Sequence, residues 1–398
     1  MLDMLTNELI QFSQTNDENP TDWLHQRAWV EINLSALASN IRGIKSCLNP
    51  QTQLMAIVKA DAYGHGATTV AYTVLQHGAS WLGVATIPEG IELRKAGISA
   101  PILILGATYS PDQIKAIAHW NLQPTLCSSE QVLVFTHTLA QINITVPVHI
   151  KIDTGMSRLG ICWENAPEFV QLVERSPHLQ IASIYSHFAT ADSEDPTIMN
   201  LQHQRFKKAI EQIKSLGVKI PFLHLANSAA TLTDKSLHYD LVRVGLSMYG
   251  YLPSPHLKTH NSPILKPVLE VKARITQIKE ISQGTGISYG HHFIAPKNMR
   301  IAIVGIGYAD GIPRNLSGKM QVILHNQLVR QLGSITMDQI MIDVTNIPNV
   351  KTGDIVTILG QEGNIEISAD TWADILGTIS WEILCGFKHR LPRISINN

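Results

Sequence analysis

A single lysine, Lys59, stands between a short apolar run and a turn that contains glycine. Residues 54–58 have the length and composition of a buried strand, and Gly64 and Gly66 allow a ligand to approach the backbone closely. Lysine is rarely buried without a partner or a reaction, and a desolvated ε-amine can form a Schiff base with an aldehyde. Lys59 is therefore either a lysine that ends a strand and reaches into solvent, or one that binds pyridoxal phosphate.

Other polar residues also follow apolar runs. They are Lys151 and Arg158 at or after 146–152, His187 after 181–185, Asn227 and Ser228 after 222–225, and Arg243 and Gly245 at the end of 241–244. Each alone has a structural explanation, because His187 could be a core histidine and Arg243 could pair with a helix end. Their shared position at the ends of runs favours a common site.

Eight short apolar runs alternate with amphipathic stretches, which predicts alternating strands and helices. We expect strands at 54–58, 81–85, 102–105, 122–126, 146–152, 181–185, 222–225 and 241–244. This number predicts an α/β fold with a (β/α)8 TIM-type barrel, in which functional residues gather at the carboxyl ends of the strands. A doubly wound sheet uses similar units, but no glycine-rich dinucleotide fingerprint follows the early strands.

The pattern of apolar and polar residues changes along the chain, and this change predicts three segments. We expect a polar N-terminal tail at 1–28, the barrel at 29–263 and a mostly β domain at 264–398. Within the last segment, strands are predicted at 271–275, 301–304, 322–324, 340–344 and 355–359, and a short helix at 371–376.

Composition excludes several classes of protein. The chain has 398 residues, 44% of them hydrophobic, with 31 Lys plus Arg against 32 Asp plus Glu, so no bulk charge favours nucleic acid or anionic lipid. Four scattered cysteines argue against a disulfide scaffold and a metal site. No apolar run approaches the roughly 20 residues of a membrane span, and no export signal is recognisable. We expect a cytoplasmic protein that binds a small molecule.

The segment AIVKADAYGHG (56–66) closely resembles the cofactor-lysine motif of alanine racemases, and the resemblance extends from about residue 29 to 393. It implies that Lys59 carries pyridoxal 5'-phosphate. The segments HLANSAA (224–230) and LVRVGL (241–246) also resemble this family. By that likeness Tyr63, Ser228 and the amides of Gly245 and Leu246 hold the phosphate. His187, Asn227 and Trp381 are further cofactor-site positions.

Arg243 corresponds to the family's arginine that donates to the pyridine nitrogen. Arginine keeps its proton, so the ring nitrogen is hydrogen-bonded but not fully protonated, which weakens the ring as an electron sink. This arrangement suits plain proton exchange at the α-carbon and discourages transamination.

Racemisation needs acid-base groups on both faces of a planar intermediate. Lys59 can supply one, and the segment GISYG (286–290) resembles the motif whose tyrosine, here Tyr289, supplies the other from the partner subunit. The family likeness thus implies a homodimer with shared sites. His187 linked to Arg243 could stabilise the Tyr289 phenolate. Without the likeness, Tyr289 could equally be an aromatic residue in a glycine-flanked turn.

Three further segments complete the implied site. In KIDTGMSRLG (151–160), Arg158 binds the substrate carboxylate, and Lys151 matches a lysine that is carbamylated in many members. In SITMDQ (334–339), the amide of Met337 contacts the same carboxylate in the partner's site. In YADG (308–311), Tyr308 narrows access to the site.

The chain departs from the family pattern at two positions. Thr336 stands where many members have cysteine, and Trp381 where most have tyrosine near the phosphate and the substrate side chain. Tryptophan fills more space and only donates, so we expect preference for alanine over serine. The family expectation is interconversion of L- and D-alanine that supplies peptidoglycan. Alternatives are an alanine/serine racemase, a decarboxylase of basic amino acids, and a non-enzymatic pyridoxal-binding protein that resembles the barrel alone.

Overall fold

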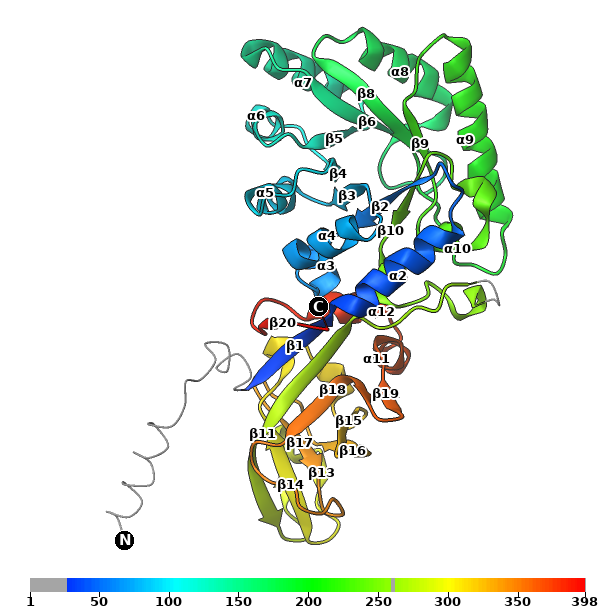
Figure 1. The fold of residues 1–398 in the computed structure, drawn as a ribbon. Coiled ribbons are helices and arrows are strands. Elements are labelled where there is room, and N and C mark those ends of the chain that lie inside the picture. The colour runs from blue at the N-terminus through cyan, green and yellow to red at the C-terminus, as the bar shows by residue number, and fades with distance from the viewer. Residues whose placement is uncertain (1–26, 259–261, 398) are drawn as a thin grey trace. The chain divides into compact units, whose positions relative to one another are not determined.

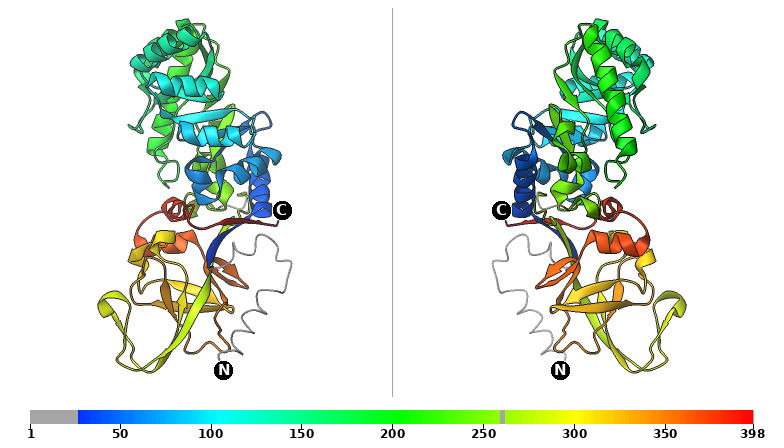
Figure 2. Two further views of the ribbon diagram at one scale, coloured as in Figure 1. Left: turned by 90° about the vertical axis from the view of Figure 1, so that its left-hand side faces the viewer. Right: turned by 90° about the vertical axis from the view of Figure 1, so that its right-hand side faces the viewer.

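The computed structural model describes residues 27–258 and 262–397 (Figures 1 and 2). The chain divides into two compact units. Among the described residues, the barrel unit comprises Ile32–Leu269, Ser368–Phe387 and 395–397, and the β unit comprises 27–31, Glu270–Ile367 and Lys388–Ile394. The predicted polar tail, 1–28, falls almost wholly outside the described residues.

Eight parallel strands form the sheet of the barrel unit. They are β2 (Gln53–Ile57), β3 (Trp81–Val84), β4 (Ile102–Ala107), β5 (Gln123–Leu126), β6 (Val146–Asp153), β8 (Leu179–Tyr185), β9 (Phe222–His224) and β10 (Leu241–Val244), in the order β10-β2-β3-β4-β5-β6-β8-β9. The Asp240 amide donates to the Leu223 carbonyl at 3.1 Å and the Arg243 amide to the Ala226 carbonyl at 3.0 Å, which nearly closes the barrel between β9 and β10. All eight predicted strands are confirmed. The short strand β7 (Ile161–Cys162) pairs with β6 beyond this sheet.

Helices pack on the outside of the strands (Figure 1). They are α2 (Leu34–Cys47), α3 (Lys59–Gly64), α4 (Ala67–Gln76), α5 (Ile87–Lys95), α6 (Pro111–His119), α7 (Ser129–Ile142), α8 (Ala166–Arg175), α9 (Thr197–Ser215) and α10 (Ser228–Thr233). Their sequences show why they form. In α8, Ala166, Phe169, Val170 and Val173 recur at helical spacing and are buried. Helix α5 begins with a Thr86–Glu89 capping box, which satisfies its first amides.

Two helices from the C-terminal third of the sequence belong to the barrel unit. These are α11 (Ala369–Leu376), which contains the predicted 371–376, and α12 (Ser380–Gly386), which was not predicted. Helix α12 packs on α3 so closely that a Cβ at Gly64 would lie 2.5 Å from the Leu384 carbonyl oxygen. Trp381, on α12, is therefore part of the barrel unit.

The β unit is built on a nine-stranded sheet in the order β19-β18-β15-β16-β17-β14-β11-β1-β20. Its strands are β1 (Ala28–Asn33), β11 (Leu269–Ile281), β14 (Met299–Val304), β15 (Gln321–Leu324), β16 (Gln327–Leu332), β17 (Ile340–Asp343), β18 (Ile355–Glu362), β19 (Ile365–Ile367) and β20 (Arg393–Ile396). The five strands predicted here are confirmed, whereas β1, β16, β19 and β20 were not predicted. The alternating burial along the first half of β11 reflects a sheet with one face in the core.

A small hairpin completes the β unit. Strands β12 (Gly286–Ile287) and β13 (Phe293–Ile294) pair with each other and flank the turn that carries Tyr289. Ile287 and Phe293 pack against a cluster formed by residues of β14, β16 and β17, which anchors the hairpin. Among the described residues, no helix has the length and apolar character that crossing a bilayer requires.

Candidate active site

The predicted site residues fall into two sets, one in each unit. In the barrel unit Trp381 lies on α12, and most of the others occupy the carboxyl ends of five strands: β2 (Lys59), β6 (Lys151 and Arg158), β8 (His187), β9 (Asn227 and Ser228) and β10 (Arg243 and Gly245). Tyr289, Tyr308, Thr336 and Met337 belong to the β unit.

Lys59 begins an unusual left-handed turn immediately after β2. Residues 60–63 have φ between 52° and 55°, in the left-handed region. For residues other than glycine this conformation costs roughly 1–2 kcal/mol each, so the surrounding contacts must hold it. The turn places the Lys59 side chain at the end of the strand.

Several hydrogen bonds hold this turn. The Ala60 amide donates to the Glu89 carboxylate at 2.8 Å, and the Ala67 amide donates to the Asp61 carboxylate at 2.8 Å. The buried Tyr249 hydroxyl donates to the Ile57 carbonyl at 3.0 Å. Glu89 was not predicted as a site residue, although the Thr-x-x-Glu pattern of its capping box is a signal for it.

The environment of Lys59 favours an uncharged amine. Burial lowers its pKa, and the positive charge of Arg158 lowers it further. The neutral amine is the nucleophilic form, and a lowered pKa makes that form more accessible, which suits a lysine that binds an aldehyde.

Arg243 lies buried on β10 and is hydrogen-bonded on two sides. Its Nη1 donates to His224 Nδ1 at 3.0 Å, and its Nη2 donates to His187 Nδ1 at 3.0 Å. Nη2 also donates to the carbonyls of Ser186 at 2.7 Å and Leu225 at 3.1 Å. The predicted link between His187 and Arg243 is thus present. Burial lowers the pKa of Arg243 to about 10, which leaves it charged at neutral pH.

A chain of buried polar side chains continues from Arg243 into the barrel. His224 Nε2 lies 2.8 Å from Ser183 Oγ, which lies 2.6 Å from His149 Nδ1, and His149 Nε2 lies 2.7 Å from Gln123 Oε1. Burial lowers the pKa of His149 to about 3 and that of His224 well below its ordinary value, so both rings are neutral. No sequence motif marks this chain, whose only signal is polar residues on strands that are otherwise apolar.

Lys151 adds a further cationic group near Arg243. Burial, then Arg243 and Arg158, lower its pKa to about 7, and its Nζ lies 4.8 Å from the centre of the Tyr185 ring. Within the described residues, no carboxylate forms an ion pair with Lys59, Lys151, Arg158 or Arg243. The nearby carboxylate of Asp153 instead accepts the amides of residues 155–157, at 2.9–3.1 Å. This excess of positive charge suits an anionic ligand.

Ser228, Gly245 and Tyr63 form a small group of donors. The Gly245 amide donates to Ser228 Oγ at 3.0 Å, and a Cβ at Gly245 would lie 2.7 Å from the Tyr63 hydroxyl oxygen. Burial raises the pKa of Tyr63, so its phenol stays protonated and can donate. Asn227 caps α10 by accepting the Ala230 amide at 3.1 Å, a structural task that sequence reasoning did not identify.

Trp381 is half-buried on α12, and Cys385 of the same helix lies near Lys59. Burial raises the pKa of the Cys385 thiol, and Lys59 opposes that effect. Cys385 was not predicted as a site residue, because a scattered cysteine carries no spacing signal.

In the β unit, three predicted residues present exposed side chains: Tyr289 (72% exposed), Met337 (53%) and Tyr308 (40%). Tyr289 and Met337 line one hollow of about 720 Å³ together with Ser288 and Thr336. The Ser334 hydroxyl donates to the Tyr289 carbonyl at 2.9 Å and so ties the Tyr289 turn to the loop that carries Met337.

Both halves of the chain match family models. The model described as alanine racemase, N-terminal domain, matches residues 32–253, and that described as alanine racemase, C-terminal domain, matches residues 268–395. The chain belongs to the alanine racemase family. This confirms the predicted family, and with it the cofactor, because alanine racemases use pyridoxal phosphate.

Individual alanine racemases are similar over nearly their whole length. That of Nostoc sp. is 65% identical over 376 residues, which cover 94% of this chain and 97% of the relative. The crystal structure of alanine racemase from Bacillus anthracis with bound L-Ala-P has a TM-score of 0.89 at 36% identity and covers 94% of this chain and 96% of that one. The alanine racemase of Streptomyces lavendulae gives a TM-score of 0.88 at 34% identity, with 94% and 97% covered. The predicted barrel followed by a mostly β domain is confirmed.

The barrel-unit residues of this alanine racemase fit pyridoxal phosphate on structural grounds. Lys59 offers an amine with a lowered pKa to the aldehyde, and Ser228, Tyr63 and the amides at Gly245 and Leu246 suit a phosphate. The unpaired cations match the negative charge of the cofactor and of a substrate carboxylate.

Proposed function

We propose that this alanine racemase interconverts L-alanine and D-alanine with two bases, Lys59 of one subunit and Tyr289 of the partner subunit. The observation that carries the proposal is Lys59 itself, a strand-end lysine whose pKa is lowered by burial and by Arg158. Bound pyridoxal phosphate would supply the electron sink that acidifies the α-proton of an attached amino acid.

Lys59 removes or returns the α-proton on one face of the substrate. Burial and Arg158 lower the pKa of its amine, which makes the neutral, proton-accepting form easier to reach. Inversion requires a second group on the opposite face, where Tyr289 of the partner subunit acts.

His187 assists the opposing tyrosine. Because Arg243 only donates, His187 must accept through Nδ1 and carry its proton on Nε2. That Nε2–H can donate to a phenolate oxygen and stabilise it.

The substrate carboxylate binds between two donors. The Arg158 guanidinium faces it from the barrel unit, and the Met337 amide of the partner subunit contacts it from the other side. Tyr308 narrows the approach. Together these groups orient the α-proton towards the two bases.

The proposal implies a homodimer, because the two bases come from different subunits. The hollow lined by Tyr289 and Met337 would complete the site of a second copy. Tyr289 and Met337, which are exposed and line the same hollow, support it, since exposed apolar groups gathered in one patch favour a protein partner. Lys151 is proposed to be carbamylated, which would replace a cation beside Arg158 with an anion. Its pKa of about 7 leaves a reactive neutral amine.

The cation excess disfavours the decarboxylase alternative. A decarboxylase of basic amino acids needs acidic groups for the distal amine of its substrate, whereas the guanidinium groups of Arg158 and Arg243 would repel one. The non-enzymatic alternative does not account for the β unit, whose C-terminal alanine racemase match spans residues 268–395.

Proton exchange in D₂O tests the two-base assignment. The purified enzyme should show a cofactor absorbance band that Lys59→Ala abolishes, and should interconvert the alanine enantiomers. Tyr289→Phe should abolish racemisation but still exchange the α-proton of one enantiomer, because one base remains. Tyr72→Phe, at another exposed tyrosine, should leave both exchanges intact. Exchange from both enantiomers in Tyr289→Phe would contradict the proposal.

A further inference from the structure

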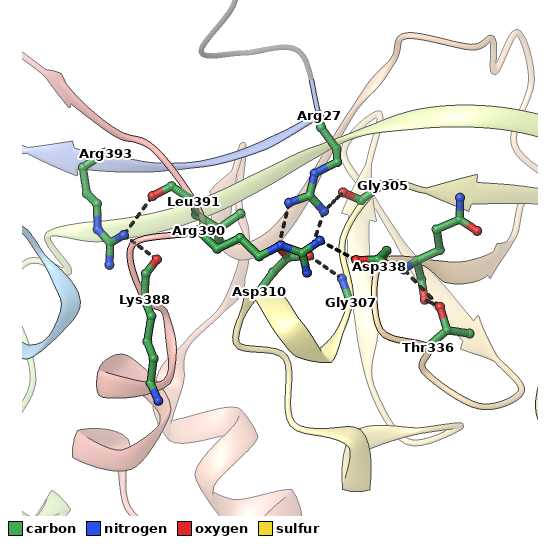
Figure 3. Close-up of polar contacts among 11 residues, drawn as sticks. Arg27, Gly305, Gly307, Asp310, Thr336, Asp338, Lys388, Arg390, Leu391 and Arg393 are labelled. Atoms are coloured by element: carbon green, nitrogen blue, oxygen red, sulfur yellow. Dashed lines mark hydrogen bonds and ion pairs between the residues drawn. The ribbon is translucent and has the colours of Figure 1, made fainter.

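Asp310 is a buried carboxylate at the end of the short 3-10 helix η7 (Tyr308–Asp310) in the β unit (Figure 3). Arg27 binds it through both ends of the guanidinium, with Nη2–Oδ1 2.6 Å and Nη1–Oδ2 2.8 Å. The Gly307 amide donates to Oδ2 at 2.9 Å, and Arg390 Nε lies 3.5 Å from Oδ1. A buried carboxylate with this many donors is held rigidly, and it holds its own loop in return.

Arg390 connects Asp310 to a second loop. Its Nη2 donates to Asp338, the residue that follows Met337. Arg393 donates to the carbonyls of Lys388 at 2.5 Å and Leu391 at 2.8 Å and so fixes the segment from which Arg390 extends (Figure 3). Arg390 thus bridges two carboxylates, Asp310 of the Tyr308 loop (residues 308–311) and Asp338 of the Met337 loop (residues 334–339).

Backbone hydrogen bonds join the same two loops. The Tyr308 amide donates to the Thr336 carbonyl at 2.9 Å, and the Ala309 amide donates to the Met337 carbonyl at 3.0 Å. The backbones are so close that a Cβ at Gly307 would lie 2.3 Å from the Thr336 carbonyl oxygen. Glycine is therefore required at 307 for the two loops to meet.

This contact sets the direction of the Met337 N–H. The peptide between Thr336 and Met337 is planar and trans, so its carbonyl and its N–H point in opposite directions. Since the Thr336 carbonyl points at Tyr308, the Met337 N–H points away from the Tyr308 loop. This N–H donates to no acceptor among the described residues, so it is available to a ligand.

We propose that Asp310, with Arg27 and Arg390, is a positioning cluster that aims the Met337 N–H at the substrate carboxylate. The inference rests on the proposed function, in which Met337 contacts the substrate in the site of the partner subunit. Asp310 itself touches no substrate. It orders the Tyr308 loop, whose amides orient the peptide that binds the carboxylate, and Arg390 braces the Met337 loop through Asp338.

The cluster predicts weaker binding of any small carboxylate when a member is removed. Asp310→Asn keeps the size of the side chain but loses its charge and one acceptor, which leaves Arg27 and Arg390 poorly matched. Loss of one well-oriented hydrogen bond to a charged group corresponds to about a tenfold change in affinity. Arg390→Gln, at a half-exposed side chain, tests the same cluster with less risk to folding.

The test measures alanine kinetics and, separately, propionate binding to the holoenzyme by titration calorimetry. Asp310→Asn and Arg390→Gln should each raise KM for both alanine enantiomers and the Kd of propionate by about tenfold, with a smaller change in kcat. The double variant should be little worse than either single variant, because both remove one network. Glu31→Gln, which removes the carboxylate paired with Lys272 at 2.7 Å in the same unit, is the control and should change neither KM nor Kd.

The outcomes separate this inference from the proposed function. If Arg390→Gln changes neither KM nor the Kd of propionate, the positioning role is wrong. It is also wrong if Glu31→Gln raises both constants as much as the cluster variants do. Neither result affects the proposed racemase activity. If the wild type binds propionate and the cluster variants weaken that binding, the cluster stands even where racemisation is not found. A wild type that does not bind propionate overturns the cluster.

Discussion

The Arg243 guanidinium donates to Nδ1 of His224 at 3.0 Å, and this single bond fixes the protonation of a whole buried chain. Arginine has no acceptor, so His224 must accept through Nδ1 and carry its proton on Nε2. That proton goes to Ser183 Oγ, the Ser183 hydroxyl donates to His149 Nδ1, and His149 Nε2–H donates to Gln123. Every member of the chain therefore has one defined direction of donation.

Ser183→Ala should break this chain at its centre. It leaves Nε2–H of His224 and Nδ1 of His149 without their partner, which should lower the free energy of unfolding by about 2 kcal/mol. Urea unfolding measures the effect. Thr138→Val is the control, because the Thr138 hydroxyl is buried without a partner within the described structure and its removal should not destabilise. Equal stability of Ser183→Ala and wild type would contradict the chain.

His149→Gln should make the free energy of unfolding less dependent on pH below about 6.5. The folded-state pKa of His149 is lowered from 6.5 to about 3, so between these values the unfolded chain binds a proton that the folded chain excludes. Stability therefore falls as pH drops from about 6.5 towards 3. The free energy of unfolding lost between pH 7 and pH 5 should be smaller by about 2 kcal/mol in His149→Gln than in the wild type. His137→Gln, at an exposed histidine, should retain the wild-type profile, and an equally flattened profile there would exclude this explanation.

Lys151 should react with carbon dioxide near neutral pH. Its pKa of about 7 leaves roughly half of the amine neutral at pH 7, and occupancy of the adduct should fall at lower pH as the amine becomes protonated. A carbon-13 NMR signal after incubation with labelled bicarbonate reports the carbamate. Lys151→Ala should lose this signal and Lys214→Ala, an exposed lysine on α9, should keep it. A wild-type spectrum without the signal would rule out the modification.

Ala60→Gly should stabilise the protein. Ala60 is exposed and has φ 53°, where the Cβ of alanine costs roughly 1–2 kcal/mol, while glycine loses roughly 0.5–1 kcal/mol of chain entropy. The net gain of about 0.5–1 kcal/mol should appear as a higher Tm. Ala140→Gly, exposed on the right-handed helix α7, should lower the Tm. A fall in Tm for both variants would show that the turn is not held in this conformation.

Trp381 should restrict the substrate to alanine. We expect kcat/KM for alanine to exceed that for serine by about tenfold or more, and Trp381→Tyr to narrow the difference, because tyrosine is smaller and can accept as well as donate. Trp120→Tyr, at the end of α6, should leave the ratio unchanged. Comparable turnover of serine and alanine by the wild type would refute this role.

Hydrophobic runs made the barrel predictable from sequence, because parallel strands buried on both faces stand out as short apolar segments. The position of Lys59 at the end of such a run, and of Arg243 within another, followed directly. The left-handed turn after Lys59 did not, because the alanines and the tyrosine in it do not favour this conformation and contacts such as that of Glu89 select it. The pairing of Arg27 with Asp310 was also hidden, since it joins residues separated by 283 positions, which no local pattern records.

Strand β1 has a consequence for how the protein is made. The strand lies between β11 and β20 in the sheet of the β unit, so that sheet combines residues from near both ends of the chain. During synthesis β1 is translated before both of its neighbours, so it stays without a partner strand until β11 is made and lacks its second partner until β20 is made. The barrel strands β2 to β10 pair with one another and need no strand from the C-terminal part of the sequence, so they can assemble earlier. A fragment that begins at the C-terminal family match, residue 268, would lack both β1 and Arg27 and could not complete this sheet.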